Sequence, residues 1–96
     1  MSSYTVRIEL RDAAAEDYIR LHSEMKAQGF KRSLICKAGT IYWLPSEEYS
    51  CISFECRQEI LDKVFKLAAG IRENPAVLVT ESSGRTWRGL EELDYS

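Results

Sequence analysis

Several residue types are scarce in this chain of 96 residues, which has one histidine, two prolines and three cysteines. An odd number of cysteines without a Cys-x-x-Cys pair argues against a disulfide framework and against a zinc site. The single histidine excludes acid–base mechanisms that need a histidine pair. Glycine-rich phosphate loops and the His-Glu-x-x-His and Gly-x-Ser-x-Gly motifs are absent, so no signature of the common nucleotide-binding or hydrolase families is present.

Long apolar segments are also absent. The longest uninterrupted apolar run is only a few residues, whereas a membrane crossing needs about 20. The first residues, Met1–Tyr4, lack the basic segment and apolar stretch of a secretory signal. We therefore expect a cytoplasmic protein without a membrane partner.

The sequence has no excess of basic charge, with 13 Lys and Arg against 15 Asp and Glu for a net charge of −2. Residues 1–44 carry seven basic and five acidic residues, whereas residues 45–96 carry six and ten. Proteins that hold nucleic acid through general phosphate contacts are usually strongly basic. We therefore expect no DNA partner, and any RNA contact must use a local basic patch in the first half, with candidates Arg7, Arg11, Lys31, Arg32 and Lys37.

The length predicts one domain over residues 1–96, with its core in about residues 4–81 and a C-terminal extension at 82–96. A chain this short hides only about 60–65 % of its unfolded surface, so a second copy would add useful buried area. We expect a homodimer in which the segment carrying Trp87 and Leu90 supplies the contact.

Hydrophobic periodicity predicts the order β-α-β-β-α-β with an extra hairpin in the middle. Asp12 is expected to cap a first helix that ends at Gly29, and a second helix is expected to stop at Asn74, before Pro75. The predicted strands cover residues 4–10, 31–37, 40–44, 49–54 and 76–80, with a possible short strand at 86–90. This order predicts an α+β fold, the ferredoxin-like sandwich, in which both helices cover one face of an antiparallel sheet of four or five strands.

The same periodicity predicts which side chains are buried. One sheet face, with Thr5, Arg7, Glu9 and Ser53, is expected to stay open for a ligand or a second subunit. The expected core consists of Val6, Ile8, Leu21, Met25, Ile52, Phe54, Ile60, Val64 and Val79.

Arg7, Arg11 and Arg32 form the most informative group of candidate site residues. If the first two strands are neighbours, these guanidinium groups share a surface, and the planar guanidinium suits phosphate. Lys31 adds charge, and Tyr42 and Trp43 on the hairpin offer aromatic surface for base stacking. The alternative is a solvated sheet edge that is protected by charge.

Glu9, Asp12 and His22 are the candidates for proton transfer beside these arginines. Glu9 or Asp12 could hold a divalent cation, and no other cofactor or metal is expected. The alternatives are structural: Asp12 as a helix cap, Glu9 in a cross-strand ion pair, and His22 as a half-packed residue at the edge of the core.

Four segments together are typical of one known family: the Tyr4–Leu10 opening, Met25-x-x-x-Gly29-Phe30, the Gly39…Leu44-Pro45 hairpin exit and Val77–Ser82. In these segments the chain resembles the GhoS family of small antitoxin endoribonucleases from type V toxin–antitoxin systems. The resemblance covers nearly the whole chain and implies a ferredoxin-like domain, related to the small nuclease subunit of CRISPR adaptation, that cleaves or binds a toxin mRNA. No established active-site residue carries over.

Three functions fit these observations. The first is an RNA-cleaving or RNA-binding antitoxin in which Arg7, Arg11 or Arg32 stabilises the phosphate and Glu9, Asp12 or His22 moves protons. The second is a non-enzymatic module that binds another protein through the open sheet face. The third is a small-ligand or regulatory domain, and the fold alone does not decide among them.

Overall fold

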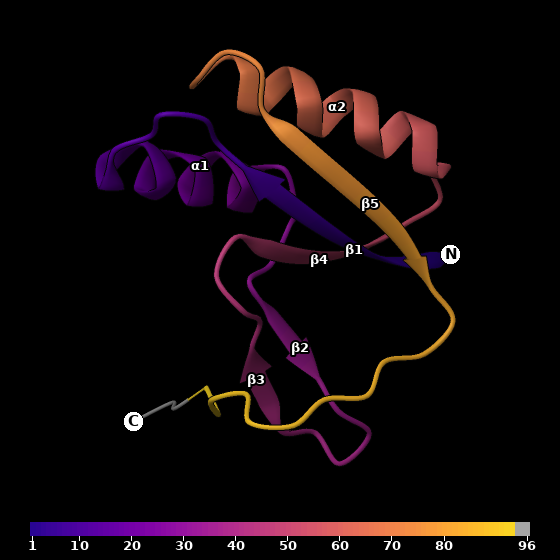
Figure 1. Ribbon diagram of the computed structural model, residues 1–96. Coiled ribbons are helices and arrows are strands. Elements are labelled where there is room, and N and C mark those ends of the chain that lie inside the picture. Colours follow the sequence, from indigo (N-terminus) through magenta and orange to yellow (C-terminus); the bar gives the residue numbers. More distant parts are fainter. Residues whose placement is uncertain (94–96) are drawn as a thin grey trace.

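The computed structural model of the protein describes residues 1–93 (Figure 1). It has an α+β architecture with two helices, a three-stranded antiparallel sheet and a two-stranded hairpin, which is compatible with the predicted ferredoxin-like sandwich. In chain order the elements are β1 (Ser2–Glu9), α1 (Ala15–Ala27), β2 (Ser33–Ile35), β3 (Ile41–Trp43), β4 (Glu48–Ser53), α2 (Arg57–Ala69) and β5 (Ala76–Ser82).

The main sheet has the order β4-β1-β5, and both pairs are antiparallel. The extra hairpin is confirmed, but β2 and β3 form a two-stranded sheet of their own, so the expected single sheet of four or five strands is divided in two. One isolated bridge, between Lys31 and Ser50, connects the hairpin to β4. The Ser50 hydroxyl then donates to the carbonyl of Ser33 at 2.7 Å, which occupies an acceptor that a continued ladder would use.

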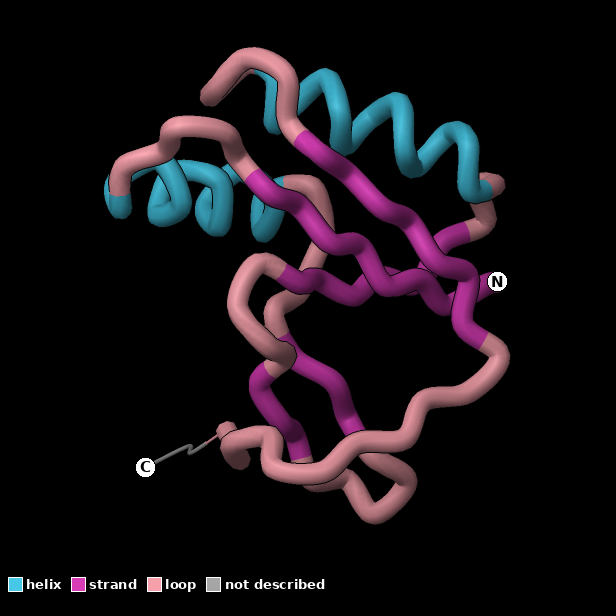
Figure 2. The backbone as a smooth tube through the Cα atoms, in the orientation of Figure 1, coloured by secondary structure: helices cyan, strands magenta, loops and turns pink. Residues whose placement is uncertain are grey.

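Both helices pack on the same face of the main sheet, because residues from both join one core with alternate residues of β1 (Figures 1 and 2). The face of β1 that carries Val6 and Ile8 is buried, whereas Arg7 and Glu9 on the other face are exposed. The core consists of Tyr4, Val6, Ile8, Leu10, Leu21, Met25, Phe30, Tyr49, Ile60, Val64 and Ala68.

The prediction that two residues on β4 and just beyond it belong to the core is wrong. Ile52 is 69 % exposed and Phe54 is 86 % exposed, whereas Tyr49 is fully buried. The pairing with β1 sets this orientation, since Tyr49 lies opposite Val6 on the helix-covered face. Ser53 lies opposite Ser2 on that face as well, so it is not part of the open face.

Two of the three predicted helix ends differ from the structure. Ala14, not Asp12, precedes the first helical residue, and the carboxylate of Asp17 accepts the N–H of Ala14 at 2.9 Å. Asp12 instead takes a left-handed conformation with φ of 51°, which Asp tolerates better than most residues. α2 ends at Ala69 rather than Asn74, and Asn74 also turns left-handed, with φ of 55°.

Gly29 confirms the predicted end of α1, since it has φ of 89° and its N–H donates to the carbonyl of Lys26 at 3.0 Å. The N–H of the buried Phe30 donates to the carbonyl of Met25, as expected for a chain that folds back on the last turn.

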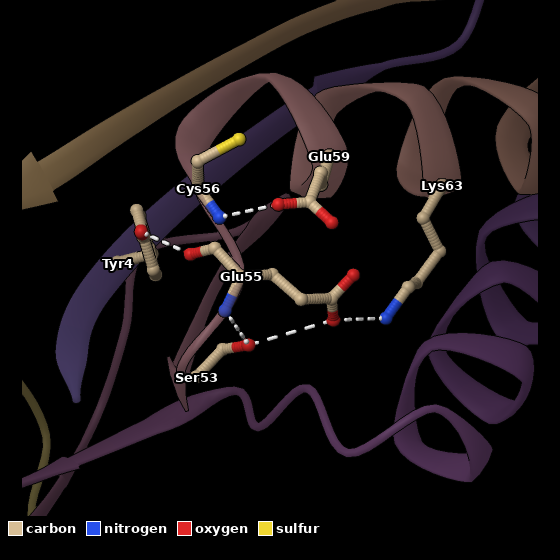
Figure 3. A network of polar contacts seen from close by, with 6 residues as sticks. All are labelled: Tyr4, Ser53, Glu55, Cys56, Glu59 and Lys63. Carbon is tan, nitrogen blue, oxygen red and sulfur yellow. Dashed lines mark hydrogen bonds and ion pairs between the residues drawn. The ribbon is translucent and has the colours of Figure 1, made fainter.

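Polar contacts connect the end of β4 to α2 (Figure 3). The hydroxyl of buried Tyr4 donates to the carbonyl of Glu55 at 2.5 Å, and the Glu55 carboxylate pairs with Lys63 at 2.6 Å. The N–H of Cys56 donates to the Glu59 carboxylate at 3.1 Å, which caps the helix start. These contacts orient α2 over the sheet.

The segment after β5 crosses to the hairpin and runs beside β3 (Figure 2). The expected strand at 86–90 is not formed; strand-like pairing occurs later, where Trp43 N–H donates to Glu91 and Leu93 N–H donates to Ile41, both at 2.8 Å. Residues 94–96 of the predicted extension lie outside the described part. Neither helix within residues 1–93 combines the length and apolar composition of a membrane-spanning segment.

Candidate functional site

Arg7 and Glu9 lie on the open face of β1, as predicted. Strand alternation points both away from the helices, and together with Leu78 they line a shallow depression of about 130 Å³. Arg7 lies directly opposite Glu48 of β4, so both residues are on the open face of the sheet. Arg7 and Glu9 are brought together, but on the sheet face that the helices do not cover.

Arg11 and Asp12 lie beyond the end of β1 in the connection to α1. The Arg11 Nε–H donates to the carbonyl of Asn74 at 2.6 Å, and this bond ties the connection to the turn before β5. Asp12 is exposed in its left-handed turn. Among residues 1–93, no group of three or more His, Cys, Asp or Glu side chains is arranged to hold a metal ion.

His22 lies on the other side of the sheet from Arg7. It faces β4 from α1, and its Nδ1 lies 2.5 Å from the hydroxyl oxygen of the fully buried Tyr49. The two rings are tilted by 52°, with centroids 5.7 Å apart. A buried hydroxyl proton needs an acceptor, so we expect Tyr49 to donate to Nδ1 and neutral His22 to carry its proton on Nε2.

Arg32 completes this group from the start of the hairpin. Its guanidinium carbon lies 5.7 Å from the ring centroid of Trp43, which is 40 % exposed, in a cation–π arrangement. We call His22, Tyr49, Arg32 and Trp43 the His22 cluster.

Burial and charge shift the acid–base properties of the His22 cluster. Burial, and then the positive charge of Arg32, lower the pKa of His22 below its usual value, so the imidazole is neutral at pH 7. Burial raises the pKa of Tyr49, which keeps its hydroxyl protonated and able to donate. Arg32 is thus close enough to act electrostatically on both partners.

Lys31 and Tyr42 have mainly structural contacts. Lys31 forms the backbone bridge to β4 and leaves its side chain exposed. The ring of Tyr42 packs edge-on against Trp87 with centroids 5.6 Å apart, so Trp43 rather than Tyr42 offers the more exposed aromatic surface.

The structure therefore does not gather the predicted site residues at one place. The expected adjacency of the first two strands does not occur, because β4 and β5 flank β1. Arg32 is near enough to His22 for its charge to lower the pKa of the imidazole, whereas Arg7 and Glu9 lie on the open face.

Sequence reasoning missed two residues of these surfaces. The sequence does not predict a role for Tyr49, because the predicted core residues Ile52 and Phe54 belong to the opposite phase of the β4 alternation. Arg85, whose Nε–H donates to the Thr5 hydroxyl at 2.9 Å, follows a Ser-Ser-Gly turn and carries no pattern of its own. The one signal in the sequence is the pair of hydroxyls of Ser3 and Thr5 on the open face, which need a hydrogen-bond donor from another segment of the chain.

Comparison with known proteins adds no relative: no family model matches the sequence, and no curated protein matches it.

Proposed function

We propose that this protein is an RNA-binding protein that acts on a toxin transcript in the manner of the GhoS antitoxins, with the His22 cluster as its phosphate and base contact. The observation that carries the proposal is the position of Arg32, stacked on a partly exposed Trp43 and electrostatically coupled to His22. A guanidinium donates in pairs to a phosphate, and an indole stacks on an unpaired base.

The tautomer of His22 decides what it contributes. With Tyr49 donating to Nδ1, the Nε2–H donates to a phosphate oxygen and supports binding. Cleavage needs the other tautomer, in which Nδ1–H donates to the Tyr49 oxygen and Nε2 accepts the proton of an RNA 2′-hydroxyl. The 2′-oxygen then bonds to phosphorus, the bond to the 5′-oxygen breaks, and water protonates that oxygen, leaving a 2′,3′-cyclic phosphate. The tautomer with the proton on Nε2 therefore supports the proposed binding, and the proposed cleavage requires one further proton shift.

Incubation with structured and unstructured RNAs, with and without EDTA, tests both steps. We expect binding at low salt, and Arg32→Gln should weaken it about tenfold, as the loss of a charge-assisted hydrogen bond does. The loss should shrink as salt rises. Product ends that carry a cyclic phosphate in the presence of EDTA would support cleavage through His22, and cleavage that EDTA abolishes would return attention to Glu9 and Asp12.

Matched variants separate a site from general electrostatics. Lys66→Gln, on the exposed side of α2, should leave binding unchanged. Arg7→Ala tests the sequence prediction that RNA also contacts the open face, because such a contact would make this variant bind RNA more weakly. Equal losses from all three variants would contradict a localised site.

An interaction module on the open sheet face is the second candidate function. Ile52 and Leu78 are 69 % and 62 % exposed and flank β1 on this face. Absence of RNA binding at low salt would favour an interaction module over an RNA-binding antitoxin.

A further inference from the structure

Arg85 connects the segment after β5 to the open face of β1. Its Nε–H and Nη1–H donate to the hydroxyls of Thr5 and Ser3, at 2.9 and 3.1 Å. Its second terminal nitrogen, Nη2, is buried and has no hydrogen-bond partner among residues 1–93. Both acceptors are neutral hydroxyls, and no carboxylate of residues 1–93 forms an ion pair with this guanidinium, so its positive charge favours an anion nearby.

A groove of about 510 Å³ lies on one side of Arg85, between the open sheet face and the hairpin. Its basic side chains are Arg85 and Lys31, its hydroxyls include Ser3 and Ser50, and no carboxylate lines it within the described chain. The volume falls within the range of small-molecule sites.

The rest of the groove wall is apolar. Ile35 of β2 and Ile52 of β4 line it, and these side chains are 68 % and 69 % exposed. Branched aliphatic side chains left this open lose water contact when an apolar ligand covers them.

A second groove, of about 580 Å³, lies on the other side of Arg85 but differs in charge. Glu48 lines it from the open face of β4, so an anion there would meet a carboxylate. Because no carboxylate of the described chain lines the groove with Lys31, that groove is the better site for an anion.

We propose that the groove lined by Lys31, Arg85, Ile35 and Ile52 binds a small free amphipathic anion. Its carboxylate or phosphate head lies against the two basic side chains, and its apolar body lies along the two isoleucines. This site is separate from the His22 cluster and does not depend on RNA binding.

Titration of the intact protein with three probes, followed by amide and methyl NMR shifts, tests the proposal. Octanoate should bind at least about tenfold more tightly than 1-octanol, which lacks the charge, and than acetate, which lacks the apolar body. The shifts should center on Lys31, Ser50, Ile52 and Arg85. Equal binding of octanoate and 1-octanol, or shifts centred elsewhere, would overturn the proposal.

Variants keep the test independent of the role of Arg85 in anchoring the chain. Lys31→Gln, whose side chain is exposed, should weaken octanoate binding about tenfold, whereas the matched Lys66→Gln on α2 should not change it. Unchanged affinity in Lys31→Gln would contradict the site. Flotation with phosphatidylglycerol vesicles separates a free ligand from a membrane surface: the protein should not float, and co-flotation in place of octanoate binding would overturn the free-ligand proposal.

Discussion

The single histidine makes the His22 cluster directly measurable, because a ring-nitrogen NMR spectrum contains one imidazole. We expect neutral His22 to carry its proton on Nε2, with a pKa below 6.5. Arg32→Gln should raise this pKa, since it removes the cationic neighbour, whereas Lys66→Gln should leave it unchanged. A proton on Nδ1 in the neutral ring would contradict donation by Tyr49 and would favour the cleavage-competent tautomer.

The lowered pKa of His22 also predicts how stability depends on pH. The folded state binds the proton less readily than the unfolded state, whose histidine pKa is about 6.5. The free energy of unfolding should therefore fall as the pH drops from 7 through 6.5 and level off below the folded-state pKa. Urea titrations of wild type and His22→Gln across pH 7 to 5 isolate this contribution; parallel curves would rule it out.

The strands show at the element scale what a pattern can predict and what it cannot. In β1 the alternation of Val6 and Ile8 with Arg7 and Glu9 predicted both faces correctly, because one set is apolar and the other charged. In β4 aromatic or apolar residues occur in both phases, and only pairing with β1 and the hydrogen bond to His22 select Tyr49 for the interior. That selection is a long-range effect that local periodicity does not contain.

The corrected phase of β4 has a simple stability test. Phe54 is 86 % exposed, so Phe54→Ala should change the free energy of unfolding by no more than about 0.5 kcal/mol. Leu21→Ala removes a fully buried side chain and should cost about 2–5 kcal/mol. Denaturant titration measures the free energy of unfolding of both variants. A large loss of stability in Phe54→Ala would mean that Phe54 is buried, as the sequence predicts.

The sequence predicted individual residues of the candidate site but not how they are arranged in space. Arg32 and His22 each stood out by chemistry, yet their meeting depends on how α1 and the hairpin pack around β4. Arg7 was correctly placed on the open face, and its separation from Arg32 follows from the pairing of β2 with β3 outside the main sheet.

For the whole molecule, the main sheet ends in two edges that differ in protection. β4 is covered in part by the bridge from Lys31 to Ser50. β5 pairs with β1 on one side, and no other strand within residues 1–93 pairs with its second side. Its residues Ala76–Ser82 include neither proline nor lysine, the two residues that commonly protect an edge strand.

The predicted homodimer is therefore expected to form through β5 rather than through the segment with Trp87, which already packs on Tyr42. Two β5 strands paired antiparallel about a two-fold axis would extend the sheet and keep both pairs of helices on one face.

Leu78→Lys introduces a lysine on β5, and lysines on edge strands commonly prevent pairing with another chain. Sedimentation of this variant at about 100 µM should therefore show a monomer. Ile52→Lys is the matched control, since Ile52 is equally exposed on the same face but on β4, and it should remain dimeric. A dimer that persists in Leu78→Lys would place the contact elsewhere, and a monomeric wild type at this concentration would contradict dimerisation itself.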